Sequence, residues 1–230
     1  MTINARFTQD IGARANASSP QTTQERRGER ANAGRLQSLA ALATTQANSR
    51  IGLVADAVVA FALLYFGLRR PDISSTVALA TALSGLVLFS FVEYGFHRWL
   101  FHGHMRDIKK AHDKHHQQPA GYDALPFFLP PLGMLALATL LVAIVPTASA
   151  LLLSGGVAAG YSLYGLSHCA MHAVHFRFAP AKRWASYHHI HHRHPEKNFG
   201  VTTPLWDIVL NTRYVSSSAN SASHRVRSRY

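Results

Sequence analysis

The chain contains four long apolar stretches that charged residues scarcely interrupt. Residues 51–68 include one charged side chain, Asp56, and residues 73–92 include none. Residues 124–167 are again uncharged, and the break at Val145-Pro146-Thr147 divides this run into two stretches. Since about 20 apolar residues cross the core of a bilayer as a helix, the pattern predicts four transmembrane helices.

A soluble bundle with buried helices is the alternative interpretation of these stretches. Helices of that kind normally carry a polar stripe toward solvent, and these stretches hardly do. We therefore expect an all-α membrane domain over residues 49–214. It is flanked by a disordered N-terminal arm at residues 1–48 and a disordered, basic tail at residues 215–230. The arm lacks the apolar core of a secretory signal, although its Arg-rich composition also loosely fits an organellar transit peptide.

The charge and the cysteine content exclude several classes of protein. A formal charge of +12 could indicate nucleic-acid binding, but no motif of that kind is present and the basic residues flank the apolar stretches. Membrane headgroups are the better partner. Cys169 is the only cysteine, which excludes an intrachain disulfide and any multi-cysteine metal site.

Histidine is the unusual component of the sequence, because fourteen of the fifteen histidines fall between His97 and His194. Ten of them follow repeated short spacings, within four groups that each span six residues or fewer. These candidate metal ligands and catalytic residues are His97, His102, His112, His115, His116, His168, His172, His188, His191 and His192. The other five, which we expect to be ordinary surface or hydrogen-bonded residues, are His104, His175, His189, His194 and His224.

Helical geometry indicates how the ten histidines can act together. Residues three and four apart share one face of a helix, so each of the last three groups can direct its imidazoles one way and form half of a metal site. The step from His97 to His102 departs from one face by about 140°. We expect this pair to lie at the end of a span or to reach two different metals. Ten imidazoles are more than one ion requires, so two ions are implied.

Four crossings place the early and the late histidine groups on the same side of the membrane as the N-terminus. The segment 98–114 and the N-terminal arm are basic, so the positive-inside rule puts that side in the cytosol. Arg69 and Arg70 do not fit this orientation, since they fall in the short loop on the other side.

A few other residues are candidates for a role beside the histidines. Glu93 precedes His97 by one turn and could bond the second nitrogen of a ligand, or be an ordinary interface carboxylate. Asp207 could orient a ligand, Gly200 could allow close backbone approach, and Trp206 could pack at the membrane interface, with ordinary loop packing as the alternative for each. Tyr187 is ambiguous, and Cys169 is expected to be a packing residue.

The motifs HRWLFH, HDKHH, HCAMH and HHIHH, followed by RHPEKNFGVTTPLWDIVLNT, resemble the fatty acid hydroxylase and sterol desaturase superfamily over roughly residues 50–214. The segment from His112 through Pro119, Leu125 and Pro130-Pro131 looks most like the fatty acid 2-hydroxylase branch. The resemblance implies four membrane helices capped by a cytosolic metal domain. It also implies that the ten histidines hold two iron ions, which zinc could replace in a purified sample, and that O2 is a co-substrate.

The resemblance also sets the expected function and its alternatives. It implies hydroxylation of a fatty acyl or sphingolipid-like chain, in a bacterial inner membrane or the endoplasmic reticulum. Gly165 stands where the 2-hydroxylase branch often has an aspartate. No cytochrome b5 haem motif is present, so a separate donor of the cytochrome b5, ferredoxin or reductase type is expected to supply electrons. The alternatives are a sterol desaturase or oxidase, a carotenoid hydroxylase, and a non-enzymatic metal transporter or store.

Overall fold

The computed structural model describes residues 32, 34–35, 37–122 and 124–216, and the described residues form helices and loops without a strand. The chain divides into two units, Met1–Ala41 and Leu42–Tyr230. In the first, residues 37–41 are helical. Most of the predicted N-terminal arm, and the tail beyond residue 216, lie outside the described residues. In the second unit, the side chain of Thr45 caps a helix that begins at Gln46, inside the range predicted for the arm.

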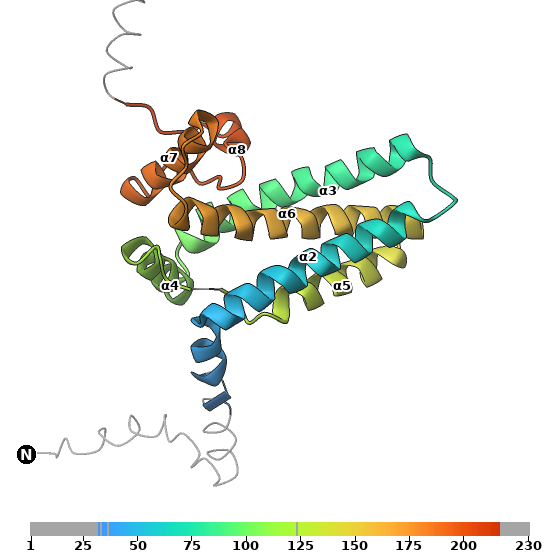
Figure 1. The fold of residues 1–230 in the computed structure, drawn as a ribbon, viewed down its shortest axis with the longest axis horizontal. Coiled ribbons are helices and arrows are strands. Elements are labelled where there is room, and N and C mark those ends of the chain that lie inside the picture. The colour runs from blue at the N-terminus through green and yellow to red at the C-terminus, as the bar shows by residue number, and fades with distance from the viewer. Residues whose placement is uncertain (1–31, 33, 36, 123, 217–230) are drawn as a thin grey trace, which may run out of the picture. The chain divides into compact units, whose positions relative to one another are not determined.

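Four apolar helices lie side by side and form the base of the second unit (Figure 1). They are α2 (Gln46–Leu68), α3 (Ser75–Gly95), α5 (Leu129–Val142) and α6 (Thr147–Ala173). Helix α6 packs against each of the other three. Glycines of α6 permit this contact. A Cβ at Gly156 would lie 2.1 Å from the carbonyl oxygen of Ala82, and one at Gly155 would lie 2.8 Å from Leu64.

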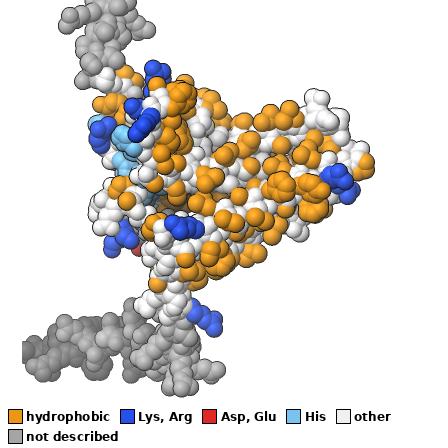
Figure 2. Space-filling model, viewed as in Figure 1, with side chains coloured by type: hydrophobic (Ala, Val, Ile, Leu, Met, Phe, Trp, Pro, Cys, Tyr) orange, Lys and Arg blue, Asp and Glu red, His pale blue; other side chains and the backbone are white. Residues whose placement is uncertain are grey.

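The outward faces of the base are apolar, as a lipid environment favours. Val58 and Phe61 of α2 are 59% and 70% exposed, and Figure 2 shows hydrophobic side chains along the helices. Among the described residues, three helical stretches have the length and composition to cross a membrane, namely Gln46–Leu68, Ser75–Phe101 and Thr147–Ala173.

The fourth predicted span is not reproduced at full length. Helix α5 has 14 residues, or about 21 Å, against the roughly 30 Å of a bilayer core. Two prolines stand in its first turn, where they favour a helix start at Leu129. The preceding segment is tied to α2 instead, because the Asn48 amide donates to the Leu125 carbonyl (2.9 Å) and accepts from the Phe127 amide (2.9 Å).

The remaining helices form a cap at one end of the base (Figure 1). They are the π-helix η1 (Phe96–Phe101), which continues α3, followed by α4 (Arg106–Gln117), α7 (Ala179–Arg193) and α8 (Leu205–Val209). The histidines and many of the Lys and Arg side chains gather at this end (Figure 2). The early and late histidine groups therefore meet, as four helices of alternating direction require.

Candidate metal centre

All ten candidate histidines converge in the cap, in two groups of five. The first group contains His97, His102, His112, His116 and His191. The second contains His115, His168, His172, His188 and His192. Within each group, one potential ligand atom of every side chain lies within 4.8 Å of the others. The groups adjoin, since the ring of His116 stacks on that of His192 with centroids 4.3 Å apart.

Helices α4 and α7 each contribute to both groups, which differs from the expectation that each sequence motif forms half of one site. On α4, His112 and His116 join the first group and His115 joins the second. On α7, His188 and His192 join the second group while His191 joins the first. Positions four apart stay within about 40° on a helix, whereas a position three after the first turns about 60° the other way. One helix can therefore serve two neighbouring centres.

The π-helix explains how His97 and His102 reach the same group. The amide of His102 donates to the carbonyl of His97 at 3.2 Å, a five-residue step that widens the turn. The prediction that His97 and His102 lie at the end of a span is correct, since η1 continues α3. The alternative, that the two reach different metals, does not fit the structure, because both belong to the first group.

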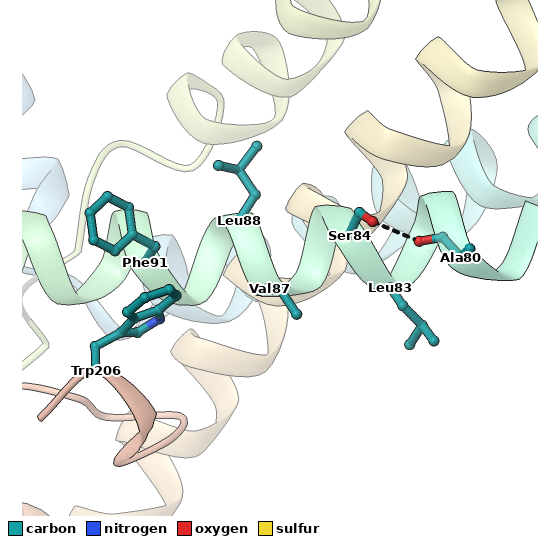
Figure 3. Close-up of a pocket in the computed structure, with 7 residues that line it drawn as sticks. All are labelled: Ala80, Leu83, Ser84, Val87, Leu88, Phe91 and Trp206. Atoms are coloured by element: carbon teal, nitrogen blue, oxygen red, sulfur yellow. Dashed lines mark hydrogen bonds between the residues drawn. The ribbon is translucent and has the colours of Figure 1, made fainter. Parts of the chain in front are cut away.

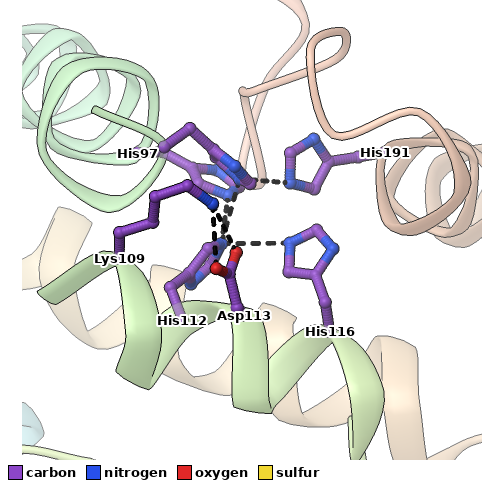
Figure 4. A network of polar contacts seen from close by, with 7 residues as sticks. His97, Lys109, His112, Asp113, His116 and His191 are labelled. Atoms are coloured by element: carbon purple, nitrogen blue, oxygen red, sulfur yellow. Dashed lines mark hydrogen bonds and ion pairs between the residues drawn. The ribbon is translucent and has the colours of Figure 1, made fainter. Parts of the chain in front are cut away.

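The nitrogen atoms of the first group are arranged as ligands around a common centre (Figure 4). The Nε2 atom of His112 lies 3.1 Å from the Nε2 atoms of His97, His102 and His116, and the same distance separates His102 from His191. Ligands at right angles around an ion lie about 3.0 Å apart when each is about 2.1 Å from it. The donor set and spacing therefore fit a transition-metal ion.

Hydrogen bonds on the opposite ring nitrogen orient two of these histidines. The Nδ1 atom of His97 donates to the carbonyl of Phe199 at 2.5 Å, and that of His191 donates to the carbonyl of Lys197 at 2.7 Å. A proton on Nδ1 leaves Nε2 with a lone pair directed at the centre. Sequence reasoning missed both carbonyls, because a backbone acceptor leaves no mark in residue type.

The second group shows the same convergence. The Nε2 atom of His188 lies 3.0 Å from the Nε2 atoms of His172 and His192. His168 completes the approach from α6, with its ring centroid 4.6 Å from that of His115. This group is therefore also a suitable arrangement of donors for an ion.

Burial keeps the imidazoles neutral, as metal ligation requires. Loss of solvent, with neighbouring histidines adding to it, lowers the pKa of His102 to about 4 and that of His192 to about 2. Burial likewise lowers the pKa of His191 to about 3, against the opposing effect of its bond to Lys197. At neutral pH these side chains carry a free lone pair rather than a positive charge.

The two candidate carboxylates form their hydrogen bonds with a loop rather than with histidine rings, the possibility raised by the sequence. Glu93 accepts hydrogen bonds from the amides of Val201 and Thr202. Asp207 accepts from the amides of Phe199 and Gly200. Both carboxylates therefore act on the loop that follows α7. Gly200 lies where expected for close backbone approach, since a Cβ there would lie 2.1 Å from the Thr203 carbonyl oxygen.

The other residues singled out in the sequence have different surroundings. Trp206 donates to the hydroxyl of Ser90 at 3.0 Å, which joins α8 to α3. Gly165 packs against Leu53, to which a Cβ would be only 2.7 Å away. Tyr187 lies on α7, and burial raises the pKa of its phenol. Cys169 is exposed, so the prediction that it is a packing residue fails.

The five histidines outside the repeated spacings do not join either group within the described part of the chain. His189 bonds the Met171 carbonyl through Nε2 at 3.0 Å, and His194 stacks on Tyr214 with centroids 4.4 Å apart. His104 and His175 are exposed. His224 lies outside the described residues.

An open apolar groove of about 490 Å³ runs along α3 toward the cap (Figure 3). It is lined along α3 from Ala80 to Phe91, and at its cap end by Trp206 of α8. Its one hydroxyl, that of Ser84, donates to the Ala80 carbonyl at 2.8 Å. The groove therefore presents hydrocarbon to whatever lies against α3.

Comparison with known proteins relates this arrangement to hydroxylases. The model of the fatty acid hydroxylase family matches residues 82–212, more than half of the chain. The dihydroceramide fatty acyl 2-hydroxylase FAH2 of Arabidopsis thaliana is 31% identical over 157 residues, which cover 64% of this chain and 63% of that protein. The fatty acid 2-hydroxylase of Rattus norvegicus is 29% identical over 164 residues, covering 61% of this chain and 41% of the relative.

A solved structure shares the fold. The hydroxylase domain visible in full-length scs7p aligns with a TM-score of 0.65 at 24% identity, over 77% of this chain and 70% of that one. The chain spans less than two thirds of the length of the curated relatives it matches. The family match extends from α3 to Thr212 and includes all ten converging histidines, and the chain belongs to the fatty acid hydroxylase family.

Proposed function

We propose that the protein is a membrane hydroxylase of fatty acyl chains and that its two histidine groups hold a pair of iron ions. The convergence of ten imidazoles into two adjoining groups of five is the observation that carries this proposal. Iron suits imidazole ligands, and when bound it would supply the O2-dependent oxidation of an unactivated C–H bond. Zinc accepts the same ligands and could replace iron in a purified sample.

The chain's own residues would position the ions and the substrate. Helix α4 and helix α7 hold the groups side by side, and the low pKa values of His102 and His191 keep their imidazoles neutral at neutral pH, with one nitrogen free to bind an ion. The reaction would convert one C–H bond and O2 to an alcohol and water, and it consumes two electrons and two protons. An acyl chain of a ceramide-like lipid is a suitable substrate because the FAH2 relative is named for that reaction.

The groove on α3 supports a hydrocarbon substrate. Its lining spans the helix from Ala80 to Phe91, about 16 Å, and it ends against Trp206 of the cap. An acyl chain lying there would run from the lipid toward the end of the base where the histidines gather. Reaction requires close approach of one carbon, so a fixed path for the rest of the chain favours a single position of oxidation.

A separate electron donor of the cytochrome b5, ferredoxin or reductase type would supply the electrons. The cap favours an acidic partner, because its exposed Lys and Arg side chains outnumber its exposed acidic ones, Asp107 and Glu196, among the described residues. Complementary charge steers such encounters. The exposed basic residues of the cap are Arg106, Lys110, Lys114, Arg177, Lys182, Arg183, Arg193 and Arg213.

Expression in a host followed by lipid mass spectrometry tests the function. The protein should yield lipids heavier by one oxygen, whereas His116→Ala and His191→Ala should yield none at equal expression. His189→Ala is the matched control, because His189 lies on α7 beside these histidines but joins neither group. Full hydroxylation by both variants would refute the proposal. Products lighter by two hydrogens would indicate desaturation, and metal uptake into vesicles without O2 or reductant would indicate a transporter.

A further inference from the structure

Two buried carboxylates hold four successive backbone amides of the loop after α7. Asp207 accepts from the amides of residues 199 and 200 at 2.9 and 2.7 Å, and Glu93 accepts from those of residues 201 and 202 at 2.5 and 3.1 Å. Glu93 also accepts from the hydroxyl of Thr202. Glu93 lies on α3 and Asp207 on α8, so the loop is held between two helices.

The held loop bears directly on the first histidine group. The carbonyl of Phe199 accepts from Nδ1 of His97. The Phe199 ring lies 5.7 Å from the rings of His102 and His191, and 6.0 Å from that of His97, measured between centroids. Just before it, the Lys197 carbonyl accepts from His191. One loop therefore contacts three of the five members of this group.

The carboxylates are fully committed to this loop and its supports. Glu93 is 6% exposed and Asp207 is 0% exposed, and a buried carboxylate is costly unless its oxygens are bonded. The Oδ1 atom of Asp207 also accepts a hydrogen bond from the hydroxyl of Thr212 at 2.6 Å. That hydroxyl lies 3.0 Å from the hydroxyl of Tyr94. Arg98 donates to that same Tyr94 hydroxyl at 2.8 Å, which brings a positive charge to the network.

The second group has a different environment. The Nδ1 atom of His188 is buried and has no hydrogen-bond partner among the described residues. The ring contacts and carbonyl bonds of the loop named above are all made to members of the first group. The two groups are thus alike in ligand type but unlike in what fixes their rings.

We propose that Glu93 and Asp207 are positioning residues for the first histidine group, so that metal retention there depends on them and retention by the second group does not. The inference rests on the proposed metal-binding function. Partners behind metal-ligating histidines set ring orientation and tautomer, and their loss typically weakens metal binding 10- to 100-fold. Here the partner is a backbone carbonyl, and the two carboxylates fix its place.

The test measures Co²⁺ binding by each group separately. His168→Ala disables the second group and His102→Ala disables the first, since the rings of these two residues contact histidines of their own group only. Glu93→Gln or Asp207→Asn is then added to each background. In the His168→Ala protein, either change should raise the Co²⁺ dissociation constant about 10- to 100-fold and alter the visible Co²⁺ spectrum. In the His102→Ala protein, the Co²⁺ dissociation constant and the visible Co²⁺ spectrum should both remain unchanged.

A control separates positioning from general loss of stability. Asn48 is buried and also holds two backbone groups, those of Leu125 and Phe127, but these belong to the segment before α5. Asn48→Ala should lower the unfolding temperature without changing Co²⁺ binding by either group. If Glu93→Gln fails to fold, Thr202→Val removes one bond to Glu93 and should show a smaller effect in the same background.

The outcomes are distinct. Selective weakening of the first group supports the proposal. Equal weakening of both groups, weakening of the second alone, or no change in either overturns it. If neither single-group background takes up Co²⁺ before the carboxylates are changed, the proposed metal-binding function itself fails.

Discussion

The backbone amide of His102 donates to the carbonyl oxygen of His97, five residues earlier in the chain, at 3.2 Å. On a regular α-helix this spacing would turn the two side chains about 140° apart. The wider π turn brings both Nε2 atoms within 3.1 Å of that of His112. A local departure from α-helical geometry at the end of α3 therefore assembles the first histidine group.

Gly103→Ala should disrupt this turn. A Cβ at Gly103 would lie 1.8 Å from the carbonyl oxygen of Trp99, a backbone atom that cannot move without reshaping η1. We expect the bound metal of the purified protein to fall from about two ions per chain toward one, by analogy with other losses of ligand orientation. Elemental analysis of the purified protein gives this number.

Gly133→Ala is the matched control, since a Cβ there meets nothing within 4 Å and α5 should if anything gain stability. A Gly103→Ala protein that keeps full metal content and activity would show that the π turn is dispensable.

Sequence predicted the helical class, the apolar base and the meeting of the ten histidines. It did so because the length of each apolar stretch and the spacing of the histidines follow directly from the residue types along the chain. His115 and His191 each join a different group from the other candidate histidines on their own helix. This could not be predicted, because it depends on where α4 and α7 face each other. The resemblance to hydroxylases is confirmed by the family match.

Three other features were predicted incorrectly or missed. Helix α5 is shorter than a full span because Asn48 hydrogen-bonds to the segment before it. Asn48 and its acceptor Leu125 are 77 residues apart in sequence. For Glu93 the sequence left two possibilities open, a bond to a histidine ring or an ordinary interface carboxylate, and missed the loop amides that it binds. The hydroxyl of Thr212, which bonds Asp207, was missed, because a threonine in a loop gives no sign of burial.

The stability of the metal-free protein should fall as the pH decreases below about 6.5. The folded-state pKa values of His102 and His191, about 4 and 3, lie below the value of an unfolded histidine. Between these values the unfolded chain binds more protons than the folded one, so acid favours unfolding. Urea unfolding of chelator-treated protein in detergent, followed by fluorescence at pH 7, 6 and 5, measures the effect. A midpoint that stays constant over this range would contradict the neutral, buried state of these imidazoles.

Filling the groove on α3 should impair hydroxylation without loss of metal. Val87 lines the groove, and Val87→Trp would place a large ring in the path proposed for the acyl chain. Turnover should fall about 10-fold or more, because a displaced substrate loses its near-attack position. Val58→Trp is the matched control, since Val58 is an exposed valine on α2 that does not line the groove. Equal turnover by the two variants would exclude the groove as the substrate path.

The cap should face the cytosol, and cysteine labelling can decide this. Cys169 is the only cysteine of the chain, so Cys169→Ser provides a background without thiols. Gln117 is exposed at the end of α4 in the cap, and Ser75 is exposed at the start of α3, near the opposite turn that carries Arg69 and Arg70.

In intact bacterial cells, a membrane-impermeant maleimide should label Ser75→Cys but reach Gln117→Cys only after permeabilisation, because the basic cap follows the positive-inside rule. The reverse pattern would place the histidines outside the cytosol, where a cytosolic electron donor could not reach them. Labelling of both positions in intact cells would show that α3 does not cross the membrane.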